Sequence, residues 1–140
     1  MVAFCAGVLL GVRDGALTAA VMEAIFSLLN PYGPALPLIT LSQVLGIAAS
    51  GAAGGLLGAI GVAGLPPVFR AVTLGAAGAL LTLFFDLVTN IASGLIFGQM
   101  RLTLLAGIPF ALWHIGWNVA LFVAIGTPLV GALQHYRSRL

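Results

Sequence analysis

The fold is decided by the stretch Leu81-Thr82-Leu83-Phe84-Phe85-Asp86-Leu87-Val88-Thr89-Asn90-Ile91-Ala92-Ser93. It lies inside an apolar run from about Ala71 to Phe97, which is long enough to cross a bilayer as a helix. Asp86 falls near the middle of this run, where an ionisable side chain is costly unless it has a partner or reaches water. Thr82, Asp86 and Asn90 follow one another at four-residue steps, so a helix places them on one stripe. We expect this stripe to face other helices or a cavity rather than lipid.

The composition of the chain predicts an integral membrane protein. Of its 140 residues, 61% are hydrophobic and only 6% are charged, whereas soluble domains carry about 25% charged residues. The apolar segments are continuous rather than alternating, which favours a helical bundle over a β-barrel. The sequence therefore predicts an all-α, polytopic bundle that forms a single transmembrane domain over residues 1–140.

Several classes of function are disfavoured by the residues present. The net charge is only +2 and no basic patch interleaves with aromatic residues, so we expect no nucleic-acid partner. Cys5 is the single cysteine, which excludes an intrachain disulfide and a cysteine-based metal cluster. No second His or Cys lies at ligand spacing from His114, so we expect no metal site. The chain has no Walker A sequence and cannot energise transport by itself. We expect no cofactor.

Breaks in the apolar pattern divide the chain into about five transmembrane or partial segments. These segments run from about Met1 to Val12, Ala16 to Asn30, Leu36 to Ile60, Ala71 to Phe97 and Leu102 to Leu133. The first reaches only about 18 Å, short of a full crossing, and we expect Arg13-Asp14-Gly15 to interrupt it. Asn30-Pro31-Tyr32-Gly33-Pro34 ends the second, because proline and glycine cannot continue a helix cheaply. Pro66-Pro67 marks a bend before the fourth.

The arginines predict the orientation of the chain in a prokaryotic cell membrane. If Arg137 and Arg139 are cytoplasmic, Arg70 and Arg13 also lie inside and Arg101 lies outside. Four of the five arginines are then on the cytoplasmic side, together with the C-terminus. The chain would begin outside in this arrangement, and an additional upstream helix would restore a cytoplasmic start.

The tight connection from Gly98 to Arg101 sets the relative depths of the polar side chains. Asp86 lies about twelve residues before the turn and His114 about thirteen after it, so the two are level in an antiparallel hairpin. Thr82 is level with Asn118 by the same count. Two layers result. Glu23, Gln43 and Asn90 belong to the outer third of the membrane, and Asp86, His114 and Asn118 lie nearer the midplane.

Aromatic residues lie among these polar groups, and some helices are broken near one face. Convergent polar groups beside aromatic walls are typical of a pocket for a small molecule. The candidate binding residues are Glu23, Asn30, Gln43, Asp86, Asn90, Phe110, Trp113, His114, Trp117 and Asn118.

Each feature also has a structural interpretation. Asp86 and His114 can simply join two helices. Glu23 can extend toward the outer interface or pair with Arg101. The tryptophans can be packing or belt residues. Pairs of small residues such as Gly51 and Gly55 usually serve helix packing.

Several short motifs resemble the substrate-binding S components of energy-coupling factor (ECF) transporters. They are Arg13-Asp14-Gly15, Asn30-Pro31-Tyr32-Gly33-Pro34, Phe85-Asp86-Leu87-Val88-Thr89-Asn90, and Gly107-Ile108-Pro109-Phe110 leading into His114 and Asn118. The resemblance implies a membrane bundle, usually of six helices, that binds a vitamin or related micronutrient near the outer face. It also implies partners: a membrane coupling protein and two cytoplasmic ATPases. Only five segments are evident here, so the family's first helix has no counterpart.

Two other functions are alternatives to substrate capture. A structural or assembly subunit of another membrane complex is the alternative suggested by the glycine-rich third segment. An intramembrane enzyme is disfavoured, because Ser93-Gly94 is a poor match to a nucleophile motif and Glu23 and Asp86 lie at different depths. We therefore expect no catalytic activity.

Overall fold

The computed structural model describes residues 1–137, and every regular element within them is a helix. The elements are α1 (Val2–Leu10), α2 (Val12–Leu28), α3 (Pro37–Ala59), the 3-10 turn η1 (Val62–Gly64), α4 (Pro67–Phe97), α5 (Met100–Leu121), the π-helical turn η2 (Phe122–Gly126) and α6 (Thr127–Arg137). The prediction of an all-α bundle is confirmed.

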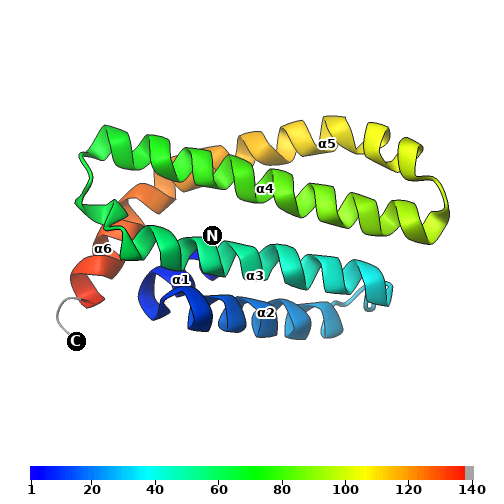
Figure 1. The fold of residues 1–140 in the computed structure, drawn as a ribbon, viewed down its shortest axis with the longest axis horizontal. Coiled ribbons are helices and arrows are strands. Elements are labelled where there is room, and N and C mark those ends of the chain that lie inside the picture. Colours follow the sequence, from blue (N-terminus) through cyan, green and yellow to red (C-terminus); the bar gives the residue numbers. More distant parts are fainter. Residues whose placement is uncertain (138–140) are drawn as a thin grey trace.

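The last three elements form one rod, as Figure 1 shows in yellow to red. Pro109 lies inside α5 without ending it. Pro128 has no backbone N–H, so it cannot donate the hydrogen bond that a regular α-helical turn makes to the carbonyl four residues earlier. The π-helical turn η2 ends two residues before it, at Gly126. Counted as one rod, these elements bring the described chain to the five segments that the sequence predicts.

Three of these segments are long and apolar enough to cross a bilayer. They are Pro37–Ala59, Pro67–Phe97 and the rod from Met100 to Leu133. The helices α1 and α2 have only 9 and 17 residues and are partial segments. Length and hydropathy thus identify a membrane protein, as the composition predicted.

One predicted break is displaced in the structure, and another lies where it was expected. The first segment ends at Gly11, whose φ of 90° favours glycine, and not at Arg13-Asp14-Gly15, which form the first turn of α2. Asp14 suits that turn because a helix N-terminus attracts negative charge. The bend predicted at Pro66-Pro67 is confirmed, and α4 begins there at Pro67 rather than at about Ala71, because proline is well tolerated at the first helical position.

The helices form two groups that meet along α3 and α4. The short helices α1 and α2 fold back at Gly11 and both pack on α3, whereas α4 and α5 form an antiparallel hairpin (Figure 1). The α2–α3 loop and the α4–α5 turn lie at one end of the bundle. Gly11, η1 and α6 lie at the other. Arg13 and Arg70 therefore share an end opposite to Arg101, as predicted, whereas Arg139 lies outside the described residues.

Glycines let the first group pack backbone against backbone. A Cβ on Gly54 would collide with the carbonyl oxygen of Phe4, and one on Gly51 would collide with that of Gly15. In lipid no hydrophobic driving force acts between helices, so van der Waals contact at this close approach stabilises their packing instead. The interpretation of these small residues as packing residues is therefore confirmed.

The large buried side chains gather toward the end that holds η1. They form one cluster of Phe4, Val8, Val62, Leu74, Phe122 and Val130. Residues buried toward the opposite end are small, among them Ser27, Ser42 and Ala92. Large apolar side chains consequently fill the bundle at one end, whereas the residues buried at the other end are small.

We predict that Gly54→Ala lowers the free energy of unfolding by about 1–3 kcal/mol, because the added methyl must displace the backbone of α1. Gly116→Ala is the matched control, since a Cβ there meets no atom within 4 Å. Equilibrium unfolding in SDS, followed by circular dichroism, measures both variants. Equal stabilities for the two would contradict the backbone contact.

Candidate functional site

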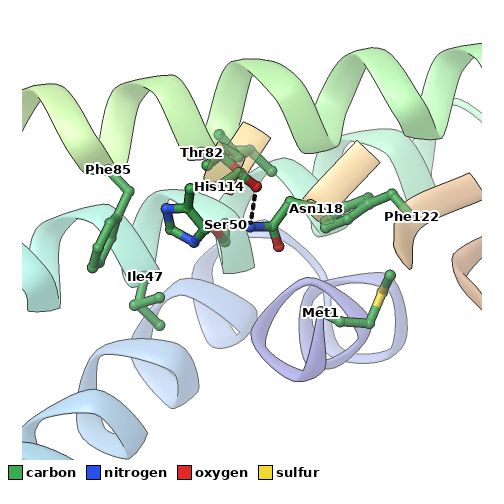
Figure 2. Close-up of a pocket in the computed structure, with 9 residues that line it drawn as sticks. Met1, Ile47, Ser50, Thr82, Phe85, His114, Asn118 and Phe122 are labelled. Atoms are coloured by element: carbon green, nitrogen blue, oxygen red, sulfur yellow. Dashed lines mark hydrogen bonds between the residues drawn. The ribbon is translucent and has the colours of Figure 1, made fainter. Parts of the chain in front are cut away.

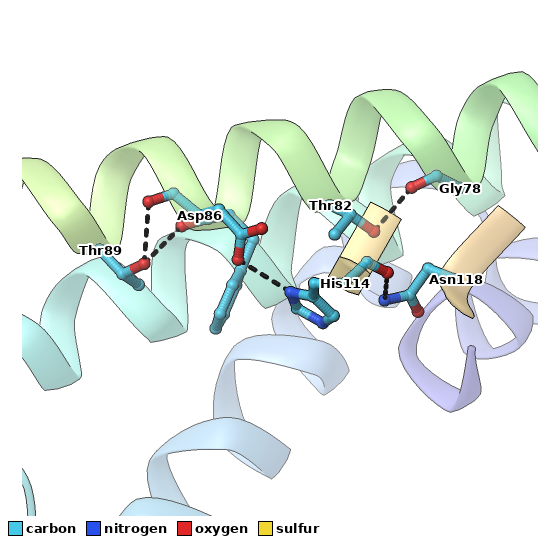
Figure 3. Close-up of polar contacts among 7 residues, drawn as sticks. Gly78, Thr82, Asp86, Thr89, His114 and Asn118 are labelled. Atoms are coloured by element: carbon cyan, nitrogen blue, oxygen red, sulfur yellow. Dashed lines mark hydrogen bonds and ion pairs between the residues drawn. The ribbon is translucent and has the colours of Figure 1, made fainter. Parts of the chain in front are cut away.

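The central feature of the site is a hydrogen bond between Asp86 of α4 and His114 of α5. The Asp86 Oδ1 atom lies 2.8 Å from the His114 Nδ1 atom (Figure 3). Asp86 is only 4% exposed, whereas the side chain of His114 is 32% exposed. The predicted equal depth of the two residues is confirmed. Asp86 is thus the buried member of the pair and His114 the accessible one.

The geometry of this pair fixes the imidazole. When Asp86 is ionised, its carboxylate only accepts hydrogen bonds, and His114 Nδ1 is then the donor of the pair. His114 Nε2 points away from Asp86 (Figure 3) and keeps its capacity for another partner. Asp86 Oδ2 is buried and has no hydrogen-bond partner in residues 1–137. The pair therefore keeps hydrogen-bonding capacity at two atoms, Asp86 Oδ2 and His114 Nε2.

The other residues of the polar stripe on α4 are buried or half-buried. The Thr82 hydroxyl donates to the carbonyl of Gly78 at 2.7 Å, and the Thr89 hydroxyl donates to that of Phe85 at 2.8 Å. Each hydroxyl is thereby satisfied within its own helix. Thr82 and Asp86 are both buried, so the stripe faces neighbouring helices, as predicted.

A cavity of about 180 Å³ opens beside the imidazole. Figure 2 shows its lining, which comes from the start of the chain, α3, α4, α5 and η2. The lining residues are Met1, Ile47, Ser50, Leu81, Thr82, Phe85, His114, Asn118 and Phe122. The space is smaller than the roughly 300–1,000 Å³ of typical ligand pockets, so it suits a compact molecule or a compact part of a larger one.

Two of the predicted residues line this cavity and a third supports it. His114 and Asn118 lie one helical turn apart on α5, and the Asn118 amide donates to the His114 carbonyl at 3.1 Å. Asp86 stands behind the imidazole and does not line the space. The inner polar layer predicted from the depth count is therefore assembled in one place.

The tryptophans of the predicted aromatic wall lie away from the cavity. Trp113 and Trp117 are 68% and 54% exposed, and their rings pack edge to face at 5.8 Å on the outer side of α5. Each precedes an inward-facing residue by one position, and one position rotates a helix by about 100°. The tryptophans therefore do not line the cavity. Phe110 is also exposed, but its ring lies 5.3 Å from that of His114.

The outer polar layer remains dispersed. Asn90 packs against Gly107, whereas Gln43 is half-buried outside the cavity lining. Glu23 accepts a hydrogen bond from Ser27 on its own helix, and no ion pair within the described chain joins it to Arg101.

Asn30 has a local role in the loop that follows α2. Its Oδ1 atom accepts a hydrogen bond from the backbone N–H of Tyr32 at 3.0 Å, which shapes the loop.

Sequence reasoning missed the contributions of α3 and of the start of α1. Ser50 and Ile47 line the cavity from α3, and Met1 lines it from the other side. Gly46 gave a usable signal, because its lack of a side chain lets the Phe85 ring approach α3 closely. Gly46 and Ser50 are small residues one helical turn apart, and this spacing is typical of a helix face that other helices approach closely.

Comparison with known proteins provides no identification: no protein-family model, curated protein or solved structure matches the chain. What the protein does must therefore be inferred from the cavity and from the sequence motifs.

We predict that Asp86 and His114 stabilise the fold jointly. Single alanine variants and the double variant should give a coupling free energy of about 1–2 kcal/mol, because His114→Ala leaves the buried Asp86 carboxylate unpaired and Asp86→Ala leaves the half-buried imidazole unpaired. A control cycle of Ser93→Ala with His114→Ala should give a coupling near zero. Unfolding in SDS measures both cycles, and additive effects in the first would contradict the hydrogen bond.

Proposed function

We propose that the protein is the substrate-capture subunit of an ECF-type importer. In this role it binds a vitamin or related micronutrient inside the bundle and passes it to a separate coupling module. The observation that carries the proposal is the half-exposed imidazole of His114, backed by a buried carboxylate and facing a cavity in the middle of a membrane bundle. Ionisable groups at such a depth are rare and are mostly functional.

The distribution of packing supports uptake from one side. The large buried side chains close the bundle between the cavity and η1, whereas the end with the α2–α3 loop is filled by smaller residues. In the orientation expected from the arginines, the closed end is cytoplasmic and the other end faces outward. A cargo would then enter from outside and be held above a dry barrier.

The resemblance to S components supplies the partners. Because the sequence has no Walker A motif, the energy for release would come from a membrane coupling protein and two ATPase subunits. The protein would be a multi-pass component of a prokaryotic cell membrane with its C-terminus in the cytoplasm, and it would not itself be an enzyme.

A structural or assembly role is the second candidate. It is favoured by the glycine contacts and by hydroxyls that bond within their own helices. Under this alternative, changes at Asp86 or His114 would impair folding or assembly without a separable loss of ligand binding.

We predict that a small molecule co-purifies with the protein in mild detergent and can be identified by mass spectrometry. Adding that molecule back should raise the melting temperature, because a ligand that binds only the folded state stabilises it. His114→Gln should weaken this stabilisation, whereas Trp113→Ala, which changes a residue outside the cavity, should preserve it. If nothing co-purifies and candidate vitamins leave the melting temperature unchanged, the capture function is contradicted.

The proposed orientation gives a separate prediction. In a Cys5→Ser background, Tyr32→Cys should react with a membrane-impermeant maleimide added to intact cells. Gly64→Cys should react only after the cells are opened. Both positions are exposed, and they lie at opposite ends of the bundle. The reverse labelling pattern would place the C-terminus outside.

A further inference from the structure

The polar atoms that line the cavity offer more hydrogen-bond acceptors than donors. The Thr82 hydroxyl donates its proton to Gly78, and the Ser50 hydroxyl donates its proton to Gly46 at 3.4 Å. Each oxygen therefore retains lone pairs for a ligand, and its proton is directed to its own helix, closely for Thr82 and weakly for Ser50. The hydroxyls on both sides of the cavity, from α3 and α4, thus present acceptors.

The residues from α5 add to this imbalance. Asn118 uses one amide proton on the carbonyl of His114, which leaves its carbonyl oxygen available (Figure 2). His114 uses its Nδ1 proton on Asp86, so in the neutral imidazole Nε2 is an acceptor. One amide proton of Asn118 is the sole side-chain donor left among the polar residues that line the cavity in residues 1–137.

The buried carboxylate behind the imidazole has the same sign as these acceptors. Asp86 is more than nine-tenths buried, and its Oδ2 atom lacks a hydrogen-bond partner in the described chain. His114 is its single ion-pair partner there; neither an arginine nor the amino group of Met1 pairs with it. With a neutral imidazole the pair carries one negative charge, which is screened weakly inside a bundle.

We infer that the cavity selects a compact organic cation, such as an amidinium or a protonated heterocyclic amine, whose N–H groups donate to His114 Nε2 and the neighbouring oxygens. This inference rests on the proposed capture function and names the chemistry of its substrate. The apolar rings and side chains of Phe85, Leu81 and Phe122 complete the lining and accommodate a flat ring. A carboxylate ligand would meet more acceptors than donors among the polar side chains of the lining.

The test uses three probes that share one ring and differ in charge: benzamidinium, benzamide and benzoate. Isothermal titration calorimetry on the full chain in mild detergent should show that benzamidinium binds about tenfold more tightly than benzamide, because its hydrogen bonds are charge-assisted. Benzoate should not bind.

Asp86→Asn separates charge from shape. The amide oxygen of asparagine can still accept the His114 Nδ1 proton, but the negative charge is gone. The preference for benzamidinium over benzamide should then disappear, whereas Trp113→Ala should retain it. If Asp86→Asn fails to fold, the three probes on the unmodified chain decide the question.

The outcomes separate the inference from the function on which it rests. Benzoate binding as tightly as benzamidinium overturns the cationic selectivity and leaves substrate capture standing. If no probe binds, the co-purified molecule decides: a basic molecule supports the inference and a neutral or acidic one overturns it. If no probe binds and no molecule co-purifies, both the inference and the capture function are overturned.

Discussion

The hydrogen bond between Asp86 and His114 is the constraint on which the arrangement of the second half of the chain depends. A carboxylate facing lipid would be far more costly than one facing a polar partner, so α4 must turn this side chain inward. The short connection after α4, with Gly98 in the left-handed conformation, then sets the register of α5. Once the pair is level and facing, the rotation of α5 is fixed. Asn118 follows His114 inward, whereas the tryptophans face outward.

A second constraint holds the first half of the chain. The short helices α1 and α2 are too short to be stabilised by crossing the membrane alone, and they lie against α3 through backbone contacts at glycines. The two halves meet where Phe4 of α1 packs edge to face on Phe122 of η2, with their ring centroids 5.1 Å apart. A Cβ on Gly78 would press on the Phe122 ring, so this glycine makes room for the contact. The cavity lies immediately beside this junction.

The sequence predicted how deep a side chain lies in the membrane better than it predicted which way that side chain points or which other helices lie next to it. Counting residues from a tight turn placed Asp86 beside His114, because rise per residue is nearly constant in a helix. The same count placed Trp117 at a similar depth, but depth alone does not tell which way a side chain points.

Counting residues from the α4–α5 turn could not show which residues of other elements line the cavity. Ser50 and Met1 reach the cavity because glycine contacts dock α1 against α3, and these are long-range contacts. The break at Gly11 was missed for a local reason. A charged Arg-Asp pair indicates an interface, but the backbone turns where a positive φ is available.

The cluster of large buried apolar side chains lies between the cavity and η1 and affects any molecule held in the cavity. Phe4, Val8 and Phe122 fill the bundle between the cavity and η1, and all three are buried. A cargo beside His114 therefore has no path toward that end unless α1 or the rod of α5 to α6 moves. The wide turn η2 places Phe122 at this point, and such turns often occur at functional positions in helices. Because interiors of this kind are close-packed, such a movement would require displacement of whole helices rather than of single side chains. If the protein captures a substrate as proposed, this cluster would oppose release toward η1 until such a movement takes place.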